Sequence, residues 1–238
     1  MGAQGELPLR PLDKNGQCRG GKRARAGRPR SPHRHRSSER HKKRHAFRAS
    51  QPLHVVTRVV PRVHSLRRRD LYAAIRDATI TVAKHESARI VHLSIQRTHL
   101  HLVVEATHKT ALAKAMQSFL ISAARMINRA LGERGNVFAD RYHATVLTTP
   151  RQVRNCVAYV LNNWRRHGED RERGWMVDPF SSAVSFGGWK ELEDRRTALR
   201  PPPTYASLIV WFPKTWLLAT GWRKHGRIGA FERPRGDE

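Results

Sequence analysis

The stretch Leu93-Ser-Ile-Gln-Arg-Thr-His-Leu-His-Leu-Val-Val-Glu105 decides the fold. It consists of two apolar runs that meet at a polar step, which predicts a β-hairpin with strands over 89–96 and 99–105. Side chains alternate along a strand, so His99 and His101 place both imidazoles on the same face of the second strand. Two nitrogen donors on one rigid face form a candidate metal site, although a His-x-His triplet alone is a weak signal in a chain with 14 histidines.

Strand and helix patterns alternate on both sides of this hairpin. Before it, His54–Val60 is rich in β-branched residues, and Arg69–Glu86 has apolar residues at helical spacing. After it, Thr110–Leu131 has the pattern of a long helix and Tyr142–Leu147 that of a strand. The order β-α-β-β-α-β predicts an α+β, ferredoxin-like antiparallel sheet with helices on one face and the other face left for a ligand. The first and third strands would be the inner pair, so the histidines would lie on a central strand.

A further helix is predicted over 151–166, with Thr149 as its N-cap and Pro150 in its first turn. Within it, Tyr159-Val-Leu-Asn-Asn163 places Tyr159 and Asn163 one turn apart on one face. Asn162 competes as the oxygen donor, and the i+4 spacing favours Asn163. Two imidazoles and an amide oxygen suit Mg²⁺, Mn²⁺ or Zn²⁺, and a phenol beside such a metal could attack a phosphodiester. A helical tyrosine is nevertheless more often a packing residue than a nucleophile.

The composition points to a polyanionic partner. The chain has 238 residues and a formal net charge of +27, which favours nucleic acid because Lys and Arg bind phosphates by releasing counterions. An anionic membrane surface is less favoured, since no long basic amphipathic helix is evident. No apolar run reaches the roughly 18 residues of a membrane span, and no signal peptide precedes the domain. We therefore expect a cytoplasmic, nucleoid-associated protein, and its two cysteines imply no disulfide framework.

Three regions are predicted along the chain. Residues 1–50 hold 15 Lys and Arg against three Asp and Glu, with few large apolar residues, and are predicted to be a disordered basic tail. Residues 51–168 are predicted to form the domain that carries the His and Tyr motifs. Residues 169–238 form a Trp-rich basic extension, in which Thr215–Gly226 combines aromatic and basic side chains suited to holding DNA.

Several residues outside the His and Tyr motifs are candidates for contacting nucleic acid. They share a basic or aromatic side chain and a place next to a predicted strand or helix end, and ordinary exposure is the alternative for each. They are His54 and Arg58, which share a strand face, Arg141 and Tyr142, which precede the last strand, and Arg165 and Arg166 at the end of the last helix.

Taken together, the His-Leu-His strand, Val137-Phe-Ala-Asp-Arg-Tyr-His143 and Tyr159-Val-Leu-Asn-Asn163 resemble the single-tyrosine HUH transposases, and most of all the REP-associated tyrosine transposases of bacteria. The likeness covers about residues 53–168, and Arg97-Thr98 departs from the Gly-Asn that often precedes the His pair in the family. The resemblance implies a DNA endonuclease and strand transferase acting on single-stranded DNA beside a hairpin, with a 5′-phosphotyrosine intermediate.

The same resemblance implies Mg²⁺ or Mn²⁺ held by His99, His101 and Asn163, with Tyr159 as the nucleophile. Relatives of this kind include monomers and dimers that exchange the tyrosine helix, so the oligomeric state stays open. The alternative is a non-catalytic DNA- or RNA-binding protein, such as a retired transposase, because basic ferredoxin-like sheets also bind RNA. Against it, the central strand carries two histidines where RNA-binding sheets carry an aromatic pair.

Overall fold

The sheet has four antiparallel strands in the order β2-β3-β1-β4. A computed structural model describes residues 46–170, 174–193 and 205–234, so most of the predicted 1–50 tail lies outside the described residues. The strands are β1 (Leu53–Arg58), β2 (Ala88–Ile95), β3 (His99–Ala106) and β4 (His143–Val146). β3 and β1 are the inner pair, which confirms the predicted topology and puts the His pair on a central strand.

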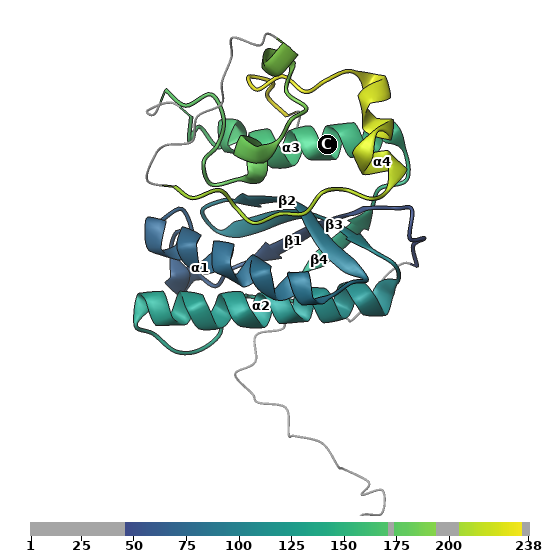
Figure 1. The fold of residues 1–238 in the computed structure, drawn as a ribbon. Helices are drawn as coiled ribbons and strands as arrows, with labels where there is room; N and C mark the ends of the chain where they lie inside the picture. Colours follow the sequence, from purple (N-terminus) through teal and green to yellow (C-terminus); the bar gives the residue numbers. More distant parts are fainter. Residues whose placement is uncertain (1–45, 171–173, 194–204, 235–238) are drawn as a thin grey trace, which may run out of the picture. The chain divides into compact units, whose positions relative to one another are not determined.

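Two helices cover one face of this sheet (Figure 1). They are α1 (Arg69–Thr79), which continues as a short 3₁₀ helix to Lys84, and α2 (Lys109–Leu131), which ends at Gly132 in the left-handed conformation. The odd-numbered residues of β1 and the even-numbered residues of β3 point into this layer. The main hydrophobic core lies there and includes Leu53, Val55, Leu100, Leu102, Val104, Ile75 and Phe119, all nearly inaccessible to solvent.

The opposite face carries α3 (Pro150–Arg166) and the C-terminal extension (Figure 1). A capping box starts α3, because Thr149 accepts from the Gln152 amide and the Gln152 side chain accepts from the Thr149 amide. A second core joins α3 to the extension through Val157, Leu161, Trp189, Leu218 and Trp222. This face is therefore covered further than the sequence predicted, and only part of it remains for a ligand.

The extension also protects the free edge of β2. The Ile95 amide donates to the Phe180 carbonyl at 2.8 Å, and the Trp211 amide donates to the Ile90 carbonyl at 2.9 Å. These bonds occupy backbone groups that an edge strand otherwise presents to another chain. None of the helices in the described ranges is long and apolar enough to cross a membrane.

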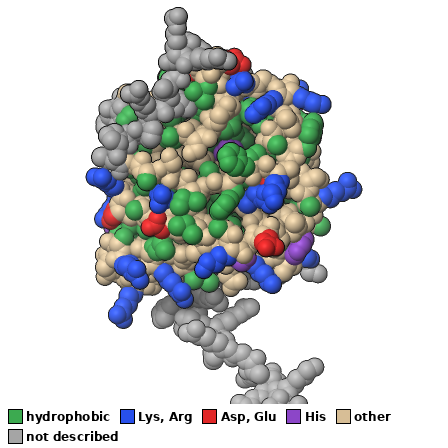
Figure 2. Space-filling view, in the orientation of Figure 1, with side chains coloured by type: hydrophobic (Ala, Val, Ile, Leu, Met, Phe, Trp, Pro, Cys, Tyr) green, Lys and Arg blue, Asp and Glu red, His purple; other side chains and the backbone are tan. Residues whose placement is uncertain are grey.

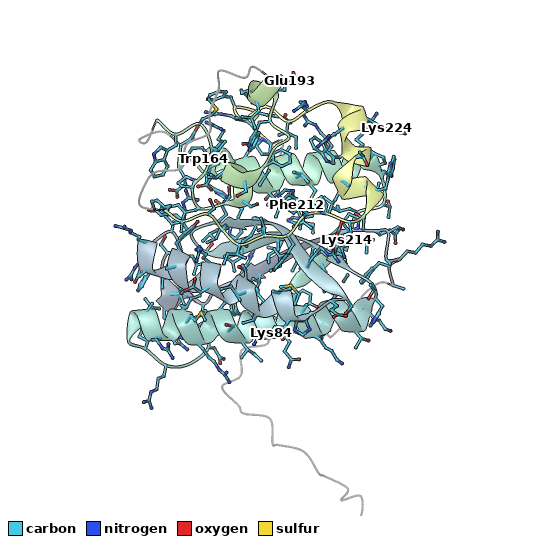
Figure 3. The ribbon with its side chains drawn as sticks, in the orientation of Figure 1. Lys84, Trp164, Glu193, Phe212, Lys214 and Lys224 are labelled. Carbon is cyan, nitrogen blue, oxygen red and sulfur yellow. The ribbon has the colours of Figure 1, made fainter. Side chains whose placement is uncertain are left out.

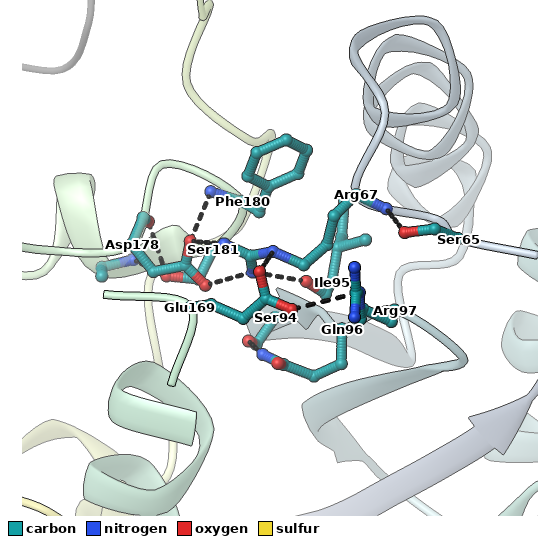
Figure 4. A network of polar contacts seen from close by, with 11 residues as sticks. Ser65, Arg67, Ser94, Ile95, Gln96, Arg97, Glu169, Asp178, Phe180 and Ser181 are labelled. Atoms are coloured by element: carbon teal, nitrogen blue, oxygen red, sulfur yellow. Dashed lines mark hydrogen bonds and ion pairs between the residues drawn. The ribbon is translucent and has the colours of Figure 1, made fainter. Parts of the chain in front are cut away.

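A buried ion pair fixes the start of the extension to the sheet (Figure 4). The Arg67 guanidinium donates to both carboxylate oxygens of Asp178 at 2.9 Å and to the Ile95 carbonyl at 3.0 Å, and it lies over the Phe180 ring. Asp178 is fully buried, and burial raises the pKa of its carboxyl while the Arg67 charge opposes that rise. Bidentate geometry of this kind is specific in direction, so it sets where the 178–182 segment lies along β2.

We expect Asp178→Asn to destabilise the fold by about 3 kcal/mol, because it removes the bidentate carboxylate of the buried Arg67 guanidinium and leaves it only the more distant Glu169 carboxylate, at 3.8 Å. Denaturant unfolding of the full chain measures the change. Asp77→Asn is the matched control, since Asp77 pairs with Arg76 at the surface and its loss should cost less than about 1 kcal/mol. Equal effects of the two substitutions would contradict the structural role given to the Arg67–Asp178 pair.

Candidate active site

Three histidines gather on the sheet face that α3 covers. In the antiparallel register of β1 and β3, His101 lies opposite Val56 and His99 opposite Arg58, so His54, Arg58 and both predicted ligands share one face. His54 Nε2 lies 3.1 Å from His101 Nδ1, and their rings stack with centroids 5.2 Å apart. The centroids of His99 and His101 are 4.7 Å apart.

One stripe of α3 faces these histidines. The Tyr159 ring meets the His101 ring edge-on at a centroid distance of 5.1 Å, and His167, just beyond the helix end, meets His99 at 5.8 Å. Asn163 lies one turn after Tyr159 and one turn before His167. Because residues four apart lie on one helix face, Asn163 is placed along β3 between the two contacts. The structure therefore brings together the four residues that the sequence predicted as nucleophile and ligands.

The two neighbouring asparagines face opposite layers. The Asn162 side chain donates to the Gly229 carbonyl at 2.9 Å, which commits it to the extension. Asn163 is completely buried, and neither its Oδ1 nor its Nδ2 has a hydrogen-bond partner among the described residues. Asn162 Oδ1 is likewise buried without a partner among the described residues, so what favours Asn163 is the tie of the Asn162 amide nitrogen to Gly229 together with the i+4 spacing of Asn163 from Tyr159.

The donor set fits a divalent metal. His101 Nε2 is also buried without a hydrogen-bond partner in the described part of the chain, and buried polar atoms are rarely left so. A cation bound by His101 Nε2 and Asn163 Oδ1 would satisfy both atoms, with His99 as the third donor. Among the described residues, no cluster of three His, Cys, Asp or Glu side chains is arranged to hold a metal, so the fit depends on the amide of Asn163.

Burial keeps the two histidines neutral. Burial is the main cause that lowers the pKa of His101 to about 2 and that of His99 to about 4, and the nearby His167 and Arg58 contribute to both of these shifts. Metal ligation requires the unprotonated imidazole, so this pocket presents both rings in the ligating form at neutral pH. His54 contributes to the lowering at His101 and is its hydrogen-bond partner as well.

The hydrogen bond with His54 selects one tautomer of His101. If His101 Nε2 offers its lone pair to a metal, the ring proton is on Nδ1 and is donated to His54 Nε2. Partners of this kind orient a ligating histidine and raise its basicity. The sequence predicted His54 as a nucleic-acid contact, whereas the structure gives it this internal role.

A cavity of about 880 Å³ opens beside the tyrosine, between β1, β4 and α3. Tyr159 and His54 line it together with Gln152, Arg154 and Asn155. Glu232 and Arg233 from the extension also line it, and the Arg154 guanidinium binds the Glu232 carboxylate there. The phenol is thus half-buried but reachable from solvent.

The remaining predicted DNA contacts fall into an exposed group and a buried group. Arg58, Arg141 and Arg166 are exposed. Arg165 is buried, because its guanidinium donates to the Ala230 and Met176 carbonyls and to Asp170, so it joins α3 to the extension. Tyr142 lies just before β4, and its ring is buried in the main core. Neither Arg165 nor Tyr142 presents its side chain to DNA in this structure.

His54 and His167 are the site residues whose roles sequence reasoning missed. Period-two spacing places His54 on the correct face, but only the pairing of β1 with β3 brings it to His101. His167 follows Asn163 by one turn, so the i+4 rule that selected Asn163 could also have selected it.

An antiparallel α+β sheet, a His pair on its central strand and a tyrosine-bearing helix together form the candidate site. Residues 48–163 match the family model described as "Transposase IS200 like", and the match runs from before β1 through Asn163. The chain belongs to this family of IS200-like transposases.

Two solved structures are similar to the chain. A REP-associated tyrosine transposase, solved bound to a REP hairpin, matches with a TM-score of 0.51 and 15% identity over 74% of this chain and 96% of that one. At this identity the likeness bears on the fold alone. A candidate transposase from Deinococcus radiodurans R1 matches with a TM-score of 0.34 and 13% identity over 56% of this chain and 97% of that one. No curated protein matches the chain.

We expect His54→Phe to weaken Mn²⁺ binding about 10- to 100-fold, because the ring volume is kept while the acceptor for His101 Nδ1–H is lost. Calorimetric titration of the full chain with Mn²⁺ measures this. His54→Gln, whose amide oxygen can accept the same proton, should recover part of the affinity. His143→Phe is the control, since His143 lies on the same sheet face, opposite Val56. Unchanged affinity in His54→Phe would contradict the orienting role.

Proposed function

We propose that the protein is a metal-dependent single-stranded DNA endonuclease and strand transferase that cleaves beside hairpins through a 5′-phosphotyrosine. The observation that carries this proposal is the stripe of Tyr159 and Asn163 on α3 against His101 and His99 on β3. Membership in the IS200-like transposases supports DNA cleavage and rejoining in general. The finer assignments rest on the residues themselves.

In the proposed reaction, Tyr159 Oη attacks the phosphorus and the bond from phosphorus to the 3′ oxygen breaks. The phenolic proton leaves to water in the open cavity, and the departing 3′ oxygen takes up a proton. A free 3′-OH and a phosphotyrosine result, so the energy of the broken bond is kept for rejoining and no nucleotide triphosphate is needed. Attack by a second 3′-OH on the phosphotyrosine restores Tyr159.

His99, His101 and Asn163 would hold Mg²⁺ or Mn²⁺. When bound, the ion polarises the scissile phosphate and neutralises charge as it develops. His54 holds the Nδ1 proton of His101 so that Nε2 stays available. The second core fixes α3 against the sheet, which keeps the phenol aligned with these groups without any rearrangement at the moment of attack.

Single-stranded and hairpin DNA is the proposed partner. The net charge of +27 favours a polyanion, and a protein with this fold has been solved with a REP hairpin. The exposed Arg58, on the histidine face, and Arg166, at the end of α3, remain the proposed phosphate contacts near the tyrosine. The 1–50 tail would add contacts that do not depend on sequence.

We expect Tyr159→Phe to abolish a covalent protein–DNA adduct while leaving DNA affinity within about twofold, since only one hydroxyl is removed. The assay mixes the full chain with labelled single-stranded hairpin DNA from beside its own gene, in Mn²⁺ or EDTA, on a denaturing gel. The adduct should need Mn²⁺, and tryptic mapping should place it on the peptide Asn155–Arg165, which contains Tyr159.

Tyr205→Phe is the control, because Tyr205 contacts Tyr72 and Phe180 away from the histidines and its loss should leave the adduct intact. An adduct that survives Tyr159→Phe would refute the nucleophile assignment. Tight binding to several hairpins with no adduct in Mn²⁺ would instead favour the non-catalytic binding protein.

A further inference from the structure

An aromatic and basic surface lies on the opposite edge of the sheet from the cavity beside Tyr159. The cavity adjoins β1 and β4, whereas Trp211 is bonded to β2, the strand at the other edge of the sheet. Phe212 is 92% exposed, Trp211 42% and Trp216 53%, which makes them three of the six exposed large hydrophobic side chains among the described residues. Large aromatics so exposed and so close in sequence indicate a binding surface.

The backbone beneath these rings is held in place. The Trp211 amide is bonded to the Ile90 carbonyl of β2. The buried Glu105 carboxylate of β3 accepts from the backbone amides of Lys214 and Thr215 at 2.8 to 3.1 Å, and from the Thr215 hydroxyl at 2.7 Å. Phe212 is therefore presented from a segment anchored on both sides, and its exposure does not come from a loose loop.

The surface is positively charged. The described segment 205–231 contains no Asp or Glu, while Lys214, Arg223 and Lys224 are exposed within it. The Lys224 ammonium lies 5.1 Å from the centre of the Trp216 ring. Figure 3 labels Phe212, Lys214 and Lys224 on the viewed side of the molecule, and Figure 2 shows hydrophobic and Lys or Arg side chains interspersed on that side.

We propose that Trp211, Phe212 and Trp216, with Lys214 and Lys224, form a second DNA-binding surface that stacks unpaired bases of a single strand. Exposed rings beside cations match the two parts of single-stranded DNA, because bases stack on aromatics and phosphates pair with Lys. A second copy of the chain is disfavoured, since each carries a net charge of +27 and would repel the other. The choice of DNA over RNA as the ligand rests on the proposed function. The inference that this surface binds a single strand rests on its exposed aromatic and basic side chains alone.

The test compares two oligonucleotides of about 12 nucleotides, oligothymidylate and an abasic chain with the same phosphates. Binding to the full chain is measured in EDTA by fluorescence anisotropy at several salt concentrations. The comparison cancels the purely electrostatic contribution of the basic tail, and cleavage plays no part. A negative result in this binding test would not change the result of the adduct assay. The proposed DNA-binding surface and the proposed function can therefore be refuted independently.

The wild type should prefer oligothymidylate by about tenfold or more, and Phe212→Ser should remove most of that preference. Lys214→Gln should weaken both oligonucleotides and lower the slope of log affinity against log salt by about 0.7. The matched controls are Ile121→Ser, an exposed apolar residue on α2, and Lys84→Gln, an exposed lysine after α1. Neither control should change the preference or the slope.

An undiminished preference in Phe212→Ser would overturn the proposal, as would an equal loss in Ile121→Ser. Tighter binding of oligouridylate than of oligothymidylate would overturn the assignment to DNA. A concentration-dependent self-association that Phe212→Ser abolishes, seen by sedimentation, would show that the surface pairs with another copy instead.

Discussion

In the antiparallel pair of β1 and β3, His101 faces Val56 and His99 faces Arg58, and this register determines the site. A slip of one residue would turn His54 or the His pair into the core under α1 and α2. The alternative is strongly opposed, because either Leu53 and Val55 of β1 or Leu100 and Leu102 of β3 would then leave that core. The same apolar packing that stabilises the sheet therefore holds three imidazoles at one place.

The helix α3 makes specific contacts on two of its sides. Tyr159 and Asn163 face the histidines, while Asn162, Arg165 and Arg154 bind the extension. An arginine at a helix end is normally solvated, yet Arg165 has three internal partners and lies against Phe231. The extension thus acts as the outer wall of the catalytic layer, and the helix is clamped between two sets of specific bonds.

The fold could be predicted because the patterns that indicate its strands and helices extend over only a few neighbouring residues. Period-two alternation places His99 and His101 on one face, and the i+4 rule pairs Tyr159 with Asn163. The bond between His54 and His101 could not be predicted, because it joins residues 47 positions apart and depends on strand register. The burial of Tyr142 depends likewise on tertiary packing, and the cover over the second sheet face comes from segments without a regular hydrophobic period. The DNA contacts of Arg58, Arg141 and Arg166 stay predictions.

The dependence of α3 on the extension has a genetic consequence. A stop codon or frameshift after residue 168 would keep every proposed catalytic group in the reading frame, yet it would strip Trp189, Leu218 and Trp222 from the second core. The exposed Val157 and Leu161 would then face water, and the product would be prone to aggregation. A truncated copy of this gene would therefore give no stably folded protein, even though the codons for its histidines and its tyrosine were unchanged.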